Sequence, residues 1–105
     1  MKRIFILLIF FLASFTNANS EIKRIVSGDL NAKITIIAYE SLTCSHCADF
    51  HKKVYPELKK DYIDKGLVKI EFRHFPLDIA ALNAAKIAQC QESQSLEILE
   101  TLYSN

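Results

Sequence analysis

The sequence predicts an α/β domain built around a strand, helix and strand in succession. Residues 34–39 (ITIIAY) form an almost unbroken β-branched and aromatic run, typical of a strand buried on both faces in the centre of a parallel sheet. From residue 44 the apolar residues recur every three or four positions, as on one face of a helix. Residues 68–74 (VKIEFRH) alternate between apolar and charged side chains, which predicts a half-exposed strand. This order predicts a right-handed βαβ unit.

The predicted long helix has recognisable ends and one interruption. Thr43 is a candidate N-cap, and Gly66 suits the position that follows the last turn. Pro56 lies inside the helix and has no N–H for the preceding turn, so we expect a kink there. The apolar stripe of this helix consists of Cys47, Phe50, Val54, Leu58 and Tyr62.

Weaker patterns extend the unit at both ends. Residues 22–26 precede a turn-like stretch, SGDLNAK, and are expected to form a short edge strand. Residues 78–93 predict a second helix with a stripe of alanines suited to close packing. Leucines and a tyrosine within residues 96–103 predict a third helix, barely completed when the sequence ends.

The N-terminal segment has the features of a secretory signal peptide. Lys2 and Arg3 precede an apolar run over residues 4–15, and small residues follow before Glu21. A membrane-spanning helix needs about 20 apolar residues, and this run is shorter. We therefore expect residues 1–20 to be a signal peptide and residues 21–105 to be one exported domain. The alternative is an uncleaved N-terminal anchor, which would also keep the domain outside the cytoplasm.

Charge and composition narrow the class of partner. The chain has 13 Lys and Arg, two of which precede Glu21, against 12 Asp and Glu, so the exported domain has a net charge near −1. Its basic residues do not gather on one face, which argues against nucleic acid as a partner.

The motif TCSHC holds Cys44 and Cys47 at the C-x-x-C spacing, with His46 before the second cysteine. This spacing suits a redox pair, half a zinc site, a copper site or a structural staple. A staple is disfavoured because a bridge between residues so close in sequence closes almost no loop. Zinc usually takes four ligands. The two cysteines together with His46 or His51 supply too few ligands for such a zinc site. A copper(I) site that uses the two thiolates remains an alternative.

The predicted fold places this motif at the carboxyl end of a parallel strand and the start of a helix, where α/β proteins do their chemistry. Unpaired N–H groups and the positive dipole end of the first turn stabilise a thiolate at Cys44, and a protonated His46 adds to this. Stabilising the reduced form makes the disulfide a stronger oxidant. Cys47, one turn further on the apolar stripe, should be more buried and suits a resolving role. We therefore predict redox chemistry in preference to metal binding.

Four segments of the chain resemble the DsbA-like branch of the thioredoxin superfamily, the exported thiol:disulfide oxidoreductases of bacteria. They are GDLNAKITI, AYESLTCSHCADFH, FRHFPLD and NAAKIAQC, and C-S-H-C is close to the C-P-H-C that these oxidases favour. The resemblance implies a thioredoxin-like fold and a protein-disulfide oxidoreductase that forms or exchanges disulfide bonds without a cofactor. It implies Cys44 as the attacking cysteine, Cys47 as its resolving partner and His46 as the residue that tunes the thiolate.

The resemblance also implies a periplasmic location, reduced cysteine-containing secreted proteins as substrates, and a membrane-bound partner that reoxidises the pair. The family continues through more helices to an antiparallel β-hairpin, so we expect a partial domain in which this C-terminal hairpin is missing. The alternatives are a periplasmic copper- or zinc-binding module that uses the same Cys and His cluster, or an inactive truncated remnant.

The remaining candidate residues are expected to be structural. Ala38 stands six positions before Cys44, where many members of the family carry a buried acid, and Glu40 is expected to point elsewhere. Cys90 is interpreted as a small buried residue of the second helix. His74 is expected to be structural or solvated, and Tyr39 and Phe75 are expected to pack.

Overall fold

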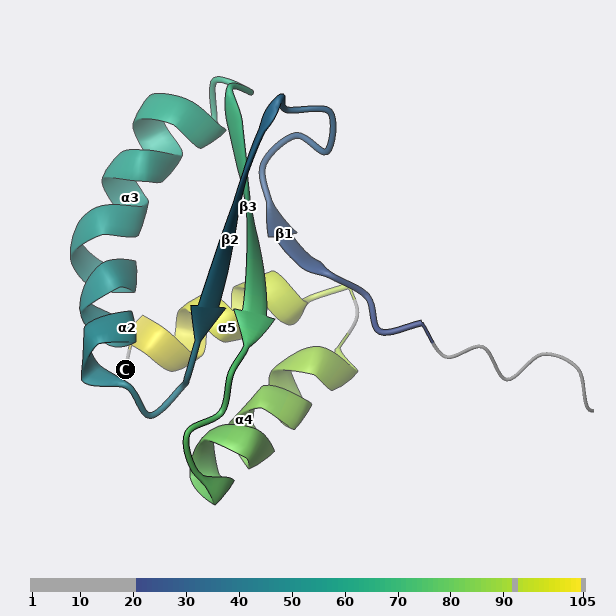
Figure 1. The fold of residues 1–105 in the computed structure, drawn as a ribbon, viewed down its shortest axis with the longest axis vertical. Helices are drawn as coiled ribbons and strands as arrows, with labels where there is room; N and C mark the ends of the chain where they lie inside the picture. Colours follow the sequence, from purple (N-terminus) through teal and green to yellow (C-terminus); the bar gives the residue numbers. More distant parts are fainter. Residues whose placement is uncertain (1–20, 92, 105) are drawn as a thin grey trace, which may run out of the picture.

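Three strands form one mixed sheet in the order β1-β3-β2 (Figure 1). The computed structural model describes residues 21–91 and 93–104, so the predicted signal peptide lies outside the described residues. β1 (Ile25–Ser27) pairs antiparallel with β3 (Val68–His74), and β2 (Ile34–Glu40) pairs parallel with β3. The predicted α/β class and its parallel strand pair are confirmed.

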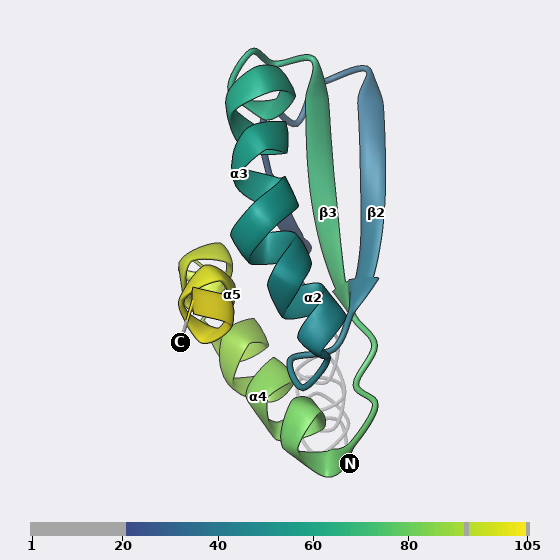
Figure 2. The same cartoon turned by 90° about the vertical axis from the view of Figure 1, so that its left-hand side faces the viewer.

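One long helical segment connects β2 to β3 and packs on one face of the sheet. It consists of α2 (Ser45–Asp49), the π-helical η1 (Phe50–Val54), α3 (Tyr55–Leu58) and the π-helical η2 (Lys59–Ile63). α4 (Ile79–Cys90) and α5 (Ser95–Ser104) follow β3. Figure 2 shows α5 on the same side of the sheet as the long helical segment, and the two are in contact. Within the described part of the chain, no helix is long and apolar enough to cross a bilayer.

The hydrophobic core lies between the sheet and these helices. Its two largest fully buried side chains are Ile70 of β3 and Leu99 of α5, both 0% exposed. The other buried members of the cluster are Ile25, Tyr55, Ile63, Val68, Phe72 and Tyr103. The core therefore ties the long helical segment, the sheet and α5 together.

β3 is the central strand of this sheet, and β2 lies at its edge. Ile36 and Ala38 of β2 pack against the core, whereas Ile37 and Tyr39 are 45% and 63% exposed. The prediction of a central strand over residues 34–39, buried on both faces, is wrong for this reason. In the described chain, helices cover only one face of β2. Its side chains therefore alternate between buried and exposed along the strand, although the side chains on both faces are apolar.

The two π-helical segments change which face of the long helical segment is buried. Val54 and Tyr62 were expected in the buried stripe, but each is 51% exposed. His51, Tyr55 and Ile63 are buried instead. A π turn bonds residue i to i+5 and so contains more residues than an α-helical turn. After such a turn, the residues that face the core come later in the sequence than the 3.6-residue period predicts. The regular spacing therefore predicts the helix correctly and its inward face only in part.

α4 begins and packs as its sequence predicts, apart from its last residue. The Asp78 carboxylate caps the helix by accepting the N–H of Ala81 at 2.7 Å. Ala81, Ala85 and Ala88 are buried, which confirms the small-residue stripe. Cys90 is exposed, so its interpretation as a buried residue is wrong. Two residues past Ala88, it lies on the opposite side of the helix.

Candidate active site

The two cysteines of the motif lie where β2 passes into α2. Cys44 is the residue that precedes the helix, with φ −88° and ψ 118°, and α2 begins at Ser45. A turn leads from the end of β2 to Cys44, because the Cys44 N–H donates to the Ser41 carbonyl at 3.0 Å. Thr43 does not cap the helix as expected. Its hydroxyl donates to Asp78 at 2.7 Å and so joins the cysteine loop to the start of α4.

The segment that follows β3 supports the cysteine loop through further hydrogen bonds. The Phe75 N–H donates to the Glu40 carbonyl at 2.7 Å. The Leu77 N–H donates to the Ser41 hydroxyl at 3.3 Å, and Ser41 is buried. The end of β2, the cysteine loop and the start of α4 are therefore joined by direct hydrogen bonds.

The two thiols have opposite electrostatic environments. The Cys47 N–H and its side chain hydrogen-bond to the Cys44 sulfur, the His46 N–H contributes too, and together they lower the Cys44 pKa. Desolvation is the main cause that raises the Cys47 pKa, and the negative charges of Cys44 and Glu40 add to it. Helix N-termini stabilise thiolates in this way. The lowered pKa favours a thiolate at Cys44, and the raised pKa favours the protonated thiol at Cys47.

A hollow of about 270 Å³, which we call the cysteine hollow, lies beside Cys47. It is lined by Ala38, Tyr39, Glu40, His46, Cys47 and Phe50. His46 itself is exposed. Its backbone N–H is the part of this residue that acts on Cys44. A tuning role for the His46 side chain stays a prediction.

Glu40, the last residue of β2, is buried under the site and paired with His51 of η1. Its Oε2 lies 2.8 Å from His51 Nε2, and both side chains are 4% exposed. The expectation that Glu40 points elsewhere is wrong. Ala38 and Glu40 are two residues apart in a strand, so they share the core-facing side. The two-residue period of a strand, counted from Ala38, would have predicted this position of the Glu40 side chain.

Aromatic rings enclose His51 and hold it in place. The Tyr103 ring of α5 stacks on the imidazole with centroids 4.0 Å apart. Phe72 of β3, Tyr55 of α3 and Phe50 lie at 5.1, 5.5 and 5.6 Å. His51 was a candidate metal ligand, but its Nε2 faces Glu40. Among the residues that the structure describes, no group of three or more His, Cys, Asp or Glu is placed to hold a metal ion.

Residues 20–105 of this chain match the family described as Thioredoxin. The chain belongs to the thioredoxin family. This assignment accounts for the parallel strand pair, the helix that starts at the C-x-x-C motif and the central strand that follows.

Individual relatives place this thioredoxin-family chain on the DsbA-like branch. A provisionally named protein-disulfide oxidoreductase of Rickettsia prowazekii is 38% identical over 66 residues, which are 63% of this chain and 24% of that protein. The crystal structure of Wolbachia pipientis alpha-DsbA1 matches with a TM-score of 0.70 and 34% identity, over 87% of this chain and 45% of that chain. A protein-disulfide isomerase from Novosphingobium aromaticivorans matches with a TM-score of 0.72 and 26% identity, over 76% and 41%.

These comparisons confirm the thioredoxin-like fold and the DsbA-like resemblance. The matched region spans less than half of each of these three relatives. The activity, substrates and partners of the whole relatives therefore reach this chain as proposals.

Proposed function

We propose that this chain is an exported protein-disulfide oxidoreductase, which forms or exchanges disulfide bonds through Cys44 and Cys47. The observation that carries the proposal is the opposite pKa shift of the two thiols at the start of α2, downward for Cys44 and upward for Cys47. A redox pair needs one cysteine that attacks and leaves as a thiolate and a second that stays protonated until it is used. The names of the relatives support the same chemistry.

In the oxidising direction, a substrate thiolate attacks the Cys44 sulfur of the Cys44–Cys47 disulfide. The disulfide breaks, a mixed disulfide forms at Cys44, and Cys47 leaves with the electron pair and takes up a proton. A second substrate thiolate then attacks the substrate sulfur of the mixed disulfide, and Cys44 leaves as a thiolate. The substrate has lost two electrons to the cysteine pair. Because the backbone N–H groups stabilise the Cys44 thiolate, they favour this last step.

The proposal extends to location and partners. The signal-like N-terminus favours export to the periplasm, where reduced cysteine-containing secreted proteins would be the substrates. The two electrons that the pair gains must leave it again. A membrane-bound redox partner would accept them and restore the disulfide.

Trapping the mixed disulfide tests this function. In bacteria that express the whole chain, Cys47→Ser removes the resolving thiol, so Cys44 should accumulate disulfide-linked adducts with exported proteins. Adducts are counted on non-reducing gels of the periplasmic fraction after acid quenching. Cys44→Ser should give none, and Cys90→Ser, the matched control, should behave as the unmodified protein. No adducts in Cys47→Ser, or equal adducts in Cys44→Ser, would contradict the proposal and favour an inactive remnant.

A further inference from the structure

A hollow of about 380 Å³, which we call the β3 hollow, lies between the end of β3, α4 and the segment before β1. Phe72 of β3 and Ala85 of α4 contribute buried apolar side chains to its lining. Ile22 also lines it and is 76% exposed, so the apolar lining continues to the molecular surface. A hollow with such a lining is suited to an apolar side chain of a ligand.

The end of β3 has an open edge beside this hollow. β1 pairs with β3 only as far as Phe72, so within the described residues no strand pairs with Arg73 and His74 on that side. The chain before β1 runs away from the sheet there (Figure 1), and Gln89 of α4 donates to the Lys23 carbonyl at 2.6 Å. An extended peptide can add to an open strand edge through its backbone N–H and C=O groups.

Positive side chains outnumber the acid in the lining of the β3 hollow. Arg24, Arg73 and Lys86 line it, together with Glu71. The buried Glu71 carboxylate is already held by both arginines, at 2.8 Å from Arg73 Nε and 3.7 Å from Arg24 Nη1. Lys86 is exposed and has no ion-pair partner among the described residues. The charges therefore favour a ligand that carries carboxylates beside its apolar group.

His74 adds a hydrogen-bonding atom that no described residue uses. It lines the β3 hollow, and its Nε2 is buried without a hydrogen-bond partner. Burial lowers the His74 pKa, so the ring is neutral at neutral pH and Nε2 can donate or accept one hydrogen bond. A buried polar atom without a partner destabilises the folded state. A ligand that hydrogen-bonds to this nitrogen would remove that cost.

The β3 hollow is connected to the cysteines across the uncovered face of the sheet. Arg73 lines the β3 hollow, and Tyr39 lines the cysteine hollow. Arg73 Nη1 donates to the Tyr39 hydroxyl at 2.9 Å, and the guanidinium carbon lies 5.6 Å from the centre of the Tyr39 ring. Tyr39 is 63% exposed. One extended polypeptide can therefore contact both hollows.

We propose that the β3 hollow binds an extended segment of the substrate polypeptide in which apolar side chains alternate with carboxylates. The inference rests on the proposed function, because it names the class of protein whose cysteines reach Cys44. An apolar side chain of the segment packs against Phe72 and Ala85. Its carboxylates lie near Lys86 and Arg24, and its backbone lies along the end of β3. This contact holds the substrate while its cysteine reacts, so it lowers the KM and leaves kcat unchanged.

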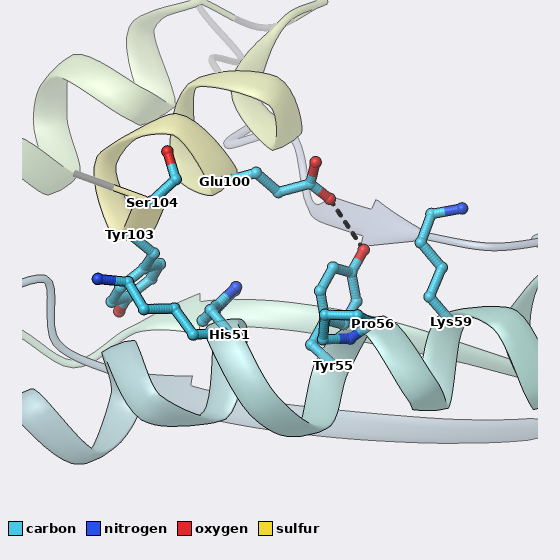
Figure 3. A pocket seen from close by; sticks show the side chains of 8 residues that line it. His51, Tyr55, Pro56, Lys59, Glu100, Tyr103 and Ser104 are labelled. Carbon is cyan, nitrogen blue, oxygen red and sulfur yellow. Dashed lines mark hydrogen bonds between the residues drawn. The ribbon is translucent and has the colours of Figure 1, made fainter.

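A larger hollow elsewhere in the molecule supplies a matched control. It has a volume of about 600 Å³, lies between the long helical segment and α5, and shares no lining residue with the β3 hollow (Figure 3). Figure 3 shows the Tyr55 hydroxyl donating to Glu100 within it, at 3.0 Å. Lys52 lines this larger hollow and is exposed, as Lys86 is. Lys52→Glu therefore makes the same change of charge as Lys86→Glu at a separate place.

Oxidation of two synthetic peptides by the oxidised whole-chain protein tests the inference. Each peptide carries two cysteines and a flanking segment, in which leucine alternates with glutamate in one peptide and with lysine in the other. Lys86→Glu should raise the KM for the glutamate peptide about 10-fold without changing kcat, because reversing a charge at the edge of a binding site weakens the attraction. The KM for the lysine peptide should fall. Lys52→Glu should leave all these constants unchanged.

Binding is also measured without redox chemistry. A glutamate peptide with serine in place of its cysteines is titrated into the unmodified protein, and its nuclear magnetic resonance signals are followed. The His74 imidazole and the backbone amides of Arg73 and Lys86 should shift, whereas the Lys52 amide should not. Replacing the leucines of the peptide by serine should weaken binding about 10-fold, because the apolar contact is lost.

The outcomes separate the inference from its alternatives. Equal KM values in Lys86→Glu and Lys52→Glu, or shifts confined to residues outside the β3 hollow, would overturn it. Binding of phosphatidylglycerol vesicles but not of the peptide, lost in Lys86→Glu, would assign the hollow to a membrane surface and would also overturn it. If the unmodified protein oxidises neither peptide while the serine peptide still shifts the His74 signals, the proposed function fails and the binding site stands.

Discussion

Replacing Gly28 by alanine should destabilise the domain much more than the same change at Gly66. Gly28 has φ +109°, and a Cβ there would lie 2.8 Å from Ile63 Cγ2, 3.0 Å from the Val68 carbonyl oxygen and 3.2 Å from Lys69 Cα. Gly66 has φ +71° and would place its Cβ in open space. The two glycines therefore share a left-handed backbone and differ in what surrounds them.

The magnitude follows from this difference. A left-handed backbone costs an L-residue about 1–2 kcal/mol, which applies to both variants. Only Gly28→Ala adds a collision. Two of its three close neighbours are backbone atoms at the start of β3, which cannot rotate away, and overpacking costs about 1–3 kcal/mol. We expect the free energy of unfolding to fall by about 2–5 kcal/mol for Gly28→Ala and by about 1–2 kcal/mol for Gly66→Ala.

Urea denaturation of the two variants and the unmodified whole chain, followed by circular dichroism under reducing conditions, measures both values. A domain of ordinary stability has about 5–15 kcal/mol in total, so the Gly28 variant should show a clearly lower midpoint. Equal losses in the two variants would refute the reasoning, because they would mean that β3 moves away from the new methyl group without cost.

Two further predictions concern the active site and its support. His46→Leu should raise the Cys44 pKa and make the reduction potential more negative, because it removes an imidazole from the first turn of the helix and leaves the backbone N–H in place. Each 30 mV of that change corresponds to about 1.4 kcal/mol. Equilibration with glutathione measures the shift, and an unchanged potential would assign the tuning to the backbone alone. Hydrogen bonds from the Ala81 N–H and then Thr43 lower the Asp78 pKa, so its contribution to stability is complete above the unfolded value of about 3.9 and is lost as the pH falls through the lower folded value. Asp78→Asn should flatten this acid dependence in denaturation midpoints measured against pH, and an unaltered dependence would show that other carboxylates produce it.

Much of the site could be predicted from local sequence. The C-x-x-C motif follows a β-branched run and precedes a helical pattern, so Cys44 had to lie near a strand end and a helix start. The two-residue period of a strand would likewise have predicted that Glu40 lies on the core side together with Ala38. The alanine spacing likewise predicts the buried face of α4.

Two features of the fold depended on the tertiary structure. The apolar run of β2 does not reveal whether one or two layers cover the strand, and Ile37 and Tyr39 are exposed because the described chain covers one face only. The inward face of the long helical segment depends on two π turns, which the 3.6-residue spacing does not predict.

Within the site, too, local sequence determined some features and tertiary packing decided others, among them the Glu40–His51 pair. The sequence alone determined that a cysteine pair stands at the start of a helix, because neighbouring residues and hydrogen-bonding periods decide such local structure. Only the tertiary structure decided that a strand carboxylate and a helix imidazole meet under Cys47, enclosed by Phe72 and Tyr103. Their contact depends on how β2, β3, the long helical segment and α5 pack together, and no local period specifies that packing.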